Sequence, residues 1–314
     1  MPATVGETVR DVAQPISRRP EGHPGGRIRQ SLGWIAVAGA AAAAIIIPLA
    51  GLLAAAQAVS LCALALAVVQ GPRRYGWKLF LAFFATCFVI SNFWENLSII
   101  TGFPFGNYYY TLMPQLFYVP VIVGVIYFGI GWVSWMTTNA VLDRADERLD
   151  LRTRAGRVNV IALPALSGAV MTMFDVGADS LISTVRSIWI WEDGGGVFGV
   201  PFTNYLGWWF VTWTFFQVFT LMLAARQTRR PARPARPLRQ VSHLQPVLTY
   251  AMFTVVSMTT FIAGGGPQTV VDPSGASWDT AALNETLMII DIFSVVPVAL
   301  FAIAKIARGD LKRA

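Results

Sequence analysis

The chain has 314 residues, of which 55% are hydrophobic and only 13% are charged, whereas about 25% of the residues of an ordinary soluble domain are charged. Both cysteines, Cys62 and Cys87, lie in apolar segments, which argues against a disulfide framework and a thiolate metal site. The histidines, His23 and His243, lie in polar segments, which argues against the metal sites of membrane oxidoreductases. We therefore predict an all-α fold, a polytopic membrane helix bundle.

The hydrophobic pattern predicts about eight transmembrane helices after a polar segment, residues 1–30, that we expect to be a disordered cytoplasmic tail. Residues 31–70 carry no charge, and a bilayer helix needs about 20 residues, so two helices joined near residues 48–51 are expected here. Residues 31–314 then form one transmembrane domain with a basic, Pro-rich cytoplasmic loop at 226–244. The six later helices are predicted over residues 77–100, 115–142, 158–185, 205–225, 245–263 and 281–306.

The basic residues predict the orientation of these helices in a cell membrane. If both termini are cytoplasmic, the cytoplasmic segments hold 23 of the 24 Lys and Arg residues, and only Arg186 lies outside. This distribution is the positive-inside pattern of multi-pass membrane proteins. The net charge of +7 therefore reports topology, and we expect membrane lipids and a lipid-soluble substrate as partners, with no nucleic acid. The pattern leaves the oligomeric state open.

Carboxyl groups lie within three of the predicted helices at one depth. Asp175 and Asp179 are four residues apart in the fifth helix and share a face, and Glu95 lies near the outer end of the third. A carboxylate inside a membrane costs several kcal/mol unless it is paired, neutralised or faces a cavity. We therefore interpret these three as candidate catalytic residues. Other polar residues at the same depth are Asn92, Asn284, Glu285 and Asp291.

Two outer connections, residues 102–108 and 199–205, share the pattern G-x-P-F-x-N-Y. Each follows an acid-bearing helix, which predicts a parallel internal repeat with an Asn cap on the next helix. Aromatic rings facing one cavity could stabilise a carbocation, whereas Trp208 and Trp209 fit an interfacial aromatic belt better. The residues predicted to bind substrate are Asn92, Trp94, Phe103, Phe105, Asn107, Tyr108, Tyr110, Trp189, Trp191, Phe202, Asn204 and Tyr205.

Four motifs carry a resemblance to a known family. They are Glu95 with T-G-F-P-F-G-x-Y-x-Y-T at 101–111, D-x-x-x-D at 175–179, W-x-W at 189–191, and F-G-V-P-F-x-N-Y-L-G-W at 198–208. In these motifs the chain resembles the carotenoid biosynthesis membrane proteins typified by the CruF carotenoid 1,2-hydratase, which include the bisanhydrobacterioruberin hydratases. The chain departs from the family pattern at Trp94, Ser180 and residues 113–115, where the family tends to have His, Pro and Gly-Pro-Lys.

The resemblance implies addition of water to the terminal C1–C2 double bond of an acyclic carotenoid. In this hypothesis, Asp175 and Asp179 share protons and act as acid and base, with Glu95 as the alternative acid. Two alternatives remain: a membrane terpene cyclase acting on an isoprenoid or an isoprenyl diphosphate, and a cation or proton transporter. The hydratase is expected to need no cofactor. Under the cyclase alternative, Mg²⁺ would be held by Asn92, Glu95, Asp175, Asp179, Asn284, Glu285 and Asp291.

Overall fold

The computed structural model describes residues 24–229, 240–264, 267–309 and 311. These residues form eight segments that are long and apolar enough to cross a membrane, which confirms the predicted all-α membrane bundle. The long helices are α1 (Pro24–Leu49), α2 (Ala55–Tyr75), α3 (Trp77–Thr101), α4 (Val121–Val141), α5 (Arg154–Val176), α6 (Phe202–Arg229), α7 (Gln240–Ala263) and α8 (Thr280–Arg308).

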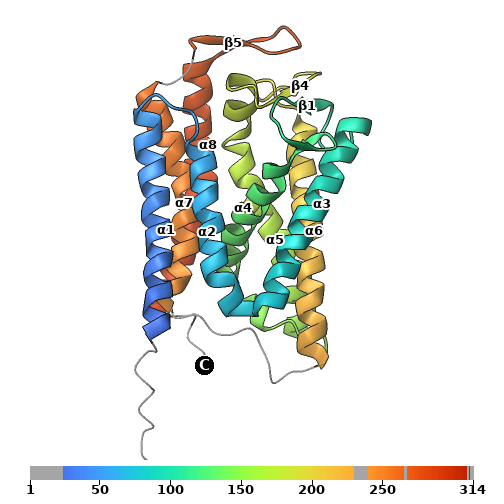
Figure 1. Cartoon of the computed structure of the whole chain (residues 1–314), viewed down its shortest axis with the longest axis vertical. Helices are drawn as coiled ribbons and strands as arrows, with labels where there is room; N and C mark the ends of the chain where they lie inside the picture. The colour runs from blue at the N-terminus through green and yellow to red at the C-terminus, as the bar shows by residue number, and fades with distance from the viewer. Residues whose placement is uncertain (1–23, 230–239, 265–266, 310, 312–314) are drawn as a thin grey trace, which may run out of the picture.

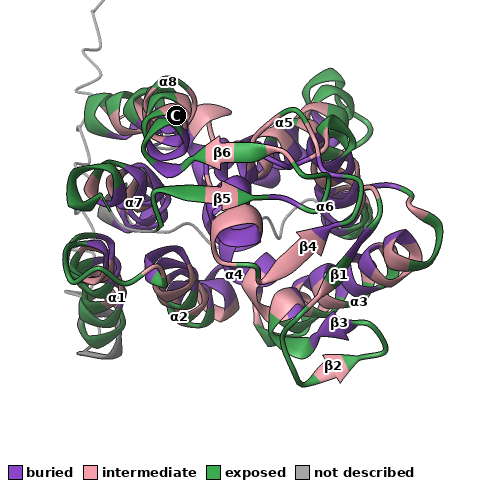
Figure 2. Cartoon of the chain, turned by 90° about the horizontal axis from the view of Figure 1, so that it is seen from above, coloured by how far each residue is buried: buried purple, intermediate pink, exposed green. Residues whose placement is uncertain are grey.

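The helices alternate in direction, so their connections gather at two ends of the bundle (Figure 1). We call one of them the hairpin end, because its connections contain all the short strands. The other is the basic end, where α2 and α3 are joined by Gly76 alone. The φ of Gly76 is 80°, a backbone conformation that glycine adopts without steric cost. Seen from the hairpin end, α4 lies at the centre of the bundle (Figure 2), and it is the most buried of the eight spans.

Three pairs of short antiparallel strands cover the hairpin end (Figures 1 and 2). One pair joins two distant connections, since the strand after α3 pairs with the strand after α5, with Tyr108 opposite Trp191 and Tyr110 opposite Trp189. This long-range pair forms a cover over the centre of the bundle. The strands are β1 (Tyr108–Tyr110), β2 (Gln115–Leu116), β3 (Val119–Pro120), β4 (Trp189–Trp191), β5 (Thr269–Val271) and β6 (Ser277–Asp279).

Two predicted helices are shorter than expected. The helix predicted over 115–142 begins only at Val121, because Gln115–Pro120 forms the β2–β3 hairpin and Pro120, which lacks an N–H, precedes the first helical turn. The helix predicted over 158–185 ends at Val176 and is followed, after a break, by a π-helical turn, η2 (Leu181–Val185).

The break in α5 lies at Gly177, which packs against α8. A Cβ atom at this position would come within 1.9 Å of Oδ1 of Asp291. Glycine also has a low helix propensity. The close approach of α8 therefore requires a glycine at the point where α5 ends.

The ends of the predicted domain also shift. The first helix begins at Pro24, inside the predicted tail of residues 1–30, and residues 1–23 lie outside the described residues. The predicted loop at 226–244 is shorter at both ends, since α6 continues to Arg229 and α7 begins at Gln240. Residues 230–239 of that loop also lie outside the described residues.

Candidate functional site

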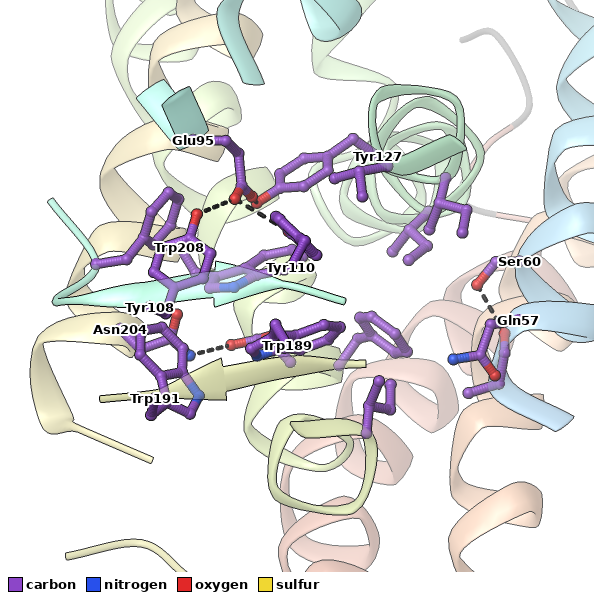
Figure 3. A pocket seen from close by; sticks show the side chains of 18 residues that line it. Gln57, Ser60, Glu95, Tyr108, Tyr110, Tyr127, Trp189, Trp191, Asn204 and Trp208 are labelled. Atoms are coloured by element: carbon purple, nitrogen blue, oxygen red, sulfur yellow. Dashed lines mark hydrogen bonds between the residues drawn. The ribbon is translucent and has the colours of Figure 1, made fainter. Parts of the chain in front are cut away.

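A mainly apolar cavity lies between α2, α3, α4, α5 and α6, beneath the β1–β4 pair (Figure 3). It holds about 680 Å³ of space not filled by atoms, part of it open to the outside. Gln57 and Ser60 of α2 lie across the cavity from Asn204 and Trp191 (Figure 3). The other lining residues that carry acids or rings are Glu95, Phe105, Tyr108, Tyr110, Tyr127, Phe174, Asp175, Trp189 and Trp208.

The strand pair explains the spacing of two of the sequence motifs. Alternate residues of a strand point to the same face, so Tyr108 and Tyr110 of β1 line the cavity together with Trp189 and Trp191 of β4. Tyr109, between the two tyrosines, is 48% exposed. The Y-x-Y and W-x-W patterns are therefore one wall of four inward-facing rings.

Glu95 is buried beside this wall and accepts hydrogen bonds from three tyrosines (Figure 3). Tyr108 and Tyr110 donate to Oε2, the latter at 3.1 Å, and Tyr127 of α4 donates to Oε1 at 2.7 Å. Burial, followed by the charge of Glu95, raises the pKa of the Tyr108 and Tyr110 phenols well above the ordinary value. These hydroxyls consequently remain protonated donors. The ring of Tyr127 is in turn stacked on Trp208, with centroids 4.7 Å apart.

Asp175 and Asp179 are held together by one side chain. The amide Nδ2 of Asn204 donates to Oδ2 of Asp175 at 3.0 Å and to Oδ2 of Asp179 at 2.6 Å. All three side chains are buried, and Asp175 and Asn204 line the cavity. Asp179 does not line the cavity itself, and its buried Oδ1 has no hydrogen-bond partner among the described residues. The predicted proximity of the two aspartates is thus present despite the helix break between them.

The two G-x-P-F-x-N-Y connections lie against each other at the hairpin end. Thr203 donates from Oγ1 to the carbonyl of Phe105 at 2.8 Å, which ties the second copy to the first. The prediction that each Asn caps a helix is wrong. Asn107 precedes β1 and bonds Asp193 at 2.7 Å, whereas Asn204 lies inside the first turn of α6. The copies differ because only the first is followed by a strand.

Several predicted binding residues lie outside the cavity. Asn92 is buried against Gly124 of α4 and donates to the Phe88 carbonyl at 2.8 Å. Trp94 packs edge-on against Phe103, which is 57% exposed. The others that do not line the cavity are Asn107, Phe202 and Tyr205.

The sequence prediction also missed residues that line the cavity. Trp208, which we expected in an aromatic belt, faces the cavity, whereas Trp209 is exposed. Tyr127 was missed because nothing in the apolar pattern of α4 distinguishes it from core aromatics. Gln57 and Ser60 had a usable signal, since they are polar residues three positions apart in the uncharged stretch 31–70.

The seven residues predicted to hold Mg²⁺ do not form one cluster. Asn284 and Asp291 line a second cavity, which Phe174 and Ile182 separate from the first. Glu285 is exposed. Among the described residues, no three His, Cys, Asp or Glu side chains are grouped so that they could hold a metal ion.

The fold and the cavity together define a multi-pass membrane protein with buried acids facing an aromatic, mainly apolar site. A family model described as "Carotenoid biosynthesis protein" matches residues 33–267, and the chain belongs to this family. The matched segment contains every residue that lines the first cavity, whereas α8 lies beyond it. No curated protein and no solved structure gives a significant match. The family supports an enzymatic role in carotenoid biosynthesis.

Proposed function

We propose that the protein adds water to a terminal double bond of an acyclic carotenoid in the cavity beneath β1 and β4. The observation that carries this proposal is the position of Asp175, which shares the Asn204 amide with Asp179 and faces a cavity walled by aromatic rings. A carboxylic acid beside an apolar cavity is suited to protonate an alkene. A hydrocarbon substrate has no polar group that the site could bind or activate, so the acid must act on the double bond itself.

The reaction begins with proton transfer from the Asp175 carboxyl group to C2 of the alkene, which forms a C–H bond and leaves a tertiary cation at C1. Water attacks C1 and forms the C–O bond, and the proton that this oxygen loses returns to the carboxylate. Asp179 shares a proton with Asp175, since two close carboxyl groups in a low dielectric do not readily ionise together. The net change is alkene plus water to tertiary alcohol.

Glu95 is better suited to stabilise the cation than to supply the proton. Its carboxylate oxygens already accept hydrogen bonds from three tyrosine hydroxyls. A fixed negative group near the cation favours its formation. The rings of Trp189 and Trp191 line the same cavity and contribute cation–π attraction of roughly 0.5–2 kcal/mol each.

Expression in a bacterium that makes lycopene tests the proposal, with mass spectrometry of the lipid extract as the measurement. We expect a product heavier by one water molecule. An isomer of unchanged mass would instead indicate cyclisation, which starts from the same protonation and ends with capture of the cation by a second double bond. An unchanged extract from lycopene and from other acyclic carotenoids would overturn both.

A further inference from the structure

A polar pocket lies at the hairpin end, between β4, the turn η2 and β5. Both strands are seen from this end in Figure 2. The pocket holds about 520 Å³ of space not filled by atoms, part of it open to the outside, and it has room for several water molecules. Its hydroxyl and carboxyl side chains are Ser183, Thr184, Ser187 and Asp272. It differs in this respect from the first cavity, whose walls are mainly apolar.

The side chains of the polar pocket suit it to hold water. Ser183 donates to the carbonyl of Asp179 at 2.9 Å, and Thr184 donates to that of Phe198 at 2.6 Å. Each hydroxyl oxygen can still accept a hydrogen bond from water, and Asp272, which follows β5, adds a carboxyl group. Cavities lined by polar groups contain ordered water, whereas apolar ones stay dry. The contact of Ser183 with Asp179 also shows that this pocket adjoins the aspartate pair.

Two tryptophan rings separate the polar pocket from the first cavity. Trp189 and Trp191 line both spaces, and among the described residues they are the only lining residues that the two have in common. The indole of Trp191 lies near the Asp179 carboxyl group, but its buried Nε1 completes no hydrogen bond with any residue that the structure describes. Buried donors are nearly always hydrogen-bonded, so this N–H is available to a water molecule at the partition.

The proposed reaction needs an opening for water that the substrate does not occupy. An acyclic carotenoid is far longer than the first cavity, so its chain must extend out through that cavity's own opening while its end is bound. Hydrocarbon then fills this opening and excludes water from it. One water molecule is nonetheless consumed for each molecule of product.

We propose that this water enters the first cavity from the polar pocket, past the indole ring of Trp191, which controls its passage. On this route a water molecule accepts a hydrogen bond from Nε1 of Trp191 and emerges in the cavity that Asp175 and Asn204 line. The proposal rests on the proposed function, because only a hydration consumes water. The route itself can be tested without the reaction.

The accessibility of a cysteine in the first cavity tests the route without any turnover. Ser60→Cys is introduced in a chain carrying Cys62→Ala and Cys87→Ala, and its reaction with a water-soluble, positively charged methanethiosulfonate is timed. Trp191→Ala should raise this rate by about 10-fold or more, because thiol exchange depends on access from water, whereas Trp191→Phe keeps a ring and should not. Adding Val271→Trp, which narrows the polar pocket, should cancel the rise.

Thr269→Trp is the matched control, since Thr269 is exposed on the same strand and does not line the polar pocket. It should leave the rise intact. A rate that does not respond to Trp191→Ala, or a rise that survives Val271→Trp, would place the water route elsewhere and overturn the proposal. Size-exclusion chromatography of each variant verifies that it is folded.

Conversion separates failure of this route from failure of the reaction. With lycopene as the substrate, Val271→Trp alone should lower the hydrated product by about 10-fold, because the supply of a reactant is narrowed, and Thr269→Trp should leave it unchanged. Unchanged hydration in Val271→Trp would overturn the route and leave the reaction standing. Absence of hydrated product from the wild type would overturn the proposed function, and the Ser60→Cys rates would still decide whether the polar pocket opens into the first cavity.

Discussion

Buried acids lie at both ends of the bundle, but the groups that pair with them differ. At the basic end, Asp146 follows α4 in a short 3₁₀ turn, η1 (Ala145–Glu147), and is completely buried. Arg74 donates to it twice, from Nη2 to Oδ1 at 2.6 Å and from Nε to Oδ2 at 2.8 Å, and Tyr75 donates to Oδ2 as well. Both oxygens of this acid are therefore paired with a cation.

At the hairpin end, Glu95, Asp175 and Asp179 are equally buried, but none of them forms an ion pair within the described parts of the chain. Their partners are neutral hydroxyl and amide groups, and one oxygen of Asp179 has no partner among the described residues. Glu95 and Asp175 also border a cavity. The paired acid holds connections together, whereas we propose that the acids without cations serve the reaction.

The largest expected effect is on catalysis. Asp175→Asn removes the proposed proton donor, so conversion should fall by about 10²- to 10⁴-fold, the usual contribution of a general acid. The Asn204 contact and the fold should survive, since the amide has nearly the same shape. Conversion is measured by mass spectrometry of lipid extracts, and Glu192→Gln, exposed beside β4, is the control. Unchanged conversion in Asp175→Asn would remove this residue from the mechanism.

At the basic end, the equivalent substitution should affect stability. Asp146→Asn removes the nearer of the two carboxylates that pair with the buried Arg74 guanidinium and leaves Glu147, whose Oε1 lies 3.2 Å from Nη2. The loss should therefore approach the about 3–5 kcal/mol that breaking a buried pair costs. The free energy of unfolding in detergent is the measurement. Asp150→Asn is the control, because Asp150 pairs with Arg152 at the surface, where ion pairs add little. Equal stability of the two variants would contradict the role given to the buried pair.

A smaller loss of activity is expected when one of the hydrogen bonds to Glu95 is removed. Tyr127→Phe removes one of three hydroxyl donors while keeping the ring that is stacked on Trp208. Conversion should fall by about 10-fold, because one hydrogen bond to a charged group is lost. Tyr109→Phe serves as the matched control, since its ring is exposed on the opposite face of β1. An equal effect of both substitutions would show that the hydroxyl on Glu95 is unimportant.

The smallest effect concerns pH. Burial alone would raise the pKa of Asp146, but the charge and hydrogen bonds of Arg74 hold it below the ordinary value of 3.8. A carboxyl group with a lowered folded pKa contributes stability that is complete above its unfolded pKa and is lost as pH falls through the folded pKa. The stability difference between wild type and Asp146→Asn should therefore be constant near neutral pH and shrink below pH 3.8. Acid titration of unfolding for both proteins measures it, and a constant difference throughout would contradict this linkage.

Much of the architecture follows from the sequence. The apolar runs predict all eight spans, because a membrane helix satisfies its own backbone and needs only length and hydrophobicity. Asp175, Asp179 and Glu95 were predicted because polar groups are costly in such segments, and Asn204 because it lies in a repeated G-x-P-F-x-N-Y connection. These four residues do lie in or directly beside one cavity.

The remaining features depend on contacts between distant segments. Pairing of β1 with β4 joins residues about 80 positions apart, and three-residue strands carry no periodic signal of their own. The break at Gly177 reflects the approach of Asp291 from α8, which local propensity does not encode. Likewise, only the packing of α4 against α3 reveals that Tyr127 is a partner of Glu95.

The most direct test of the central claim is the conversion of an acyclic carotenoid per folded molecule, compared between Asp175→Asn and Asp146→Asn. The account predicts that Asp175→Asn folds normally and forms almost no hydrated product. Asp146→Asn should give fewer folded molecules, each of which converts substrate as the wild type does. Wild-type conversion by Asp175→Asn, or loss of conversion in the folded fraction of Asp146→Asn, would contradict the division between a structural acid and catalytic acids.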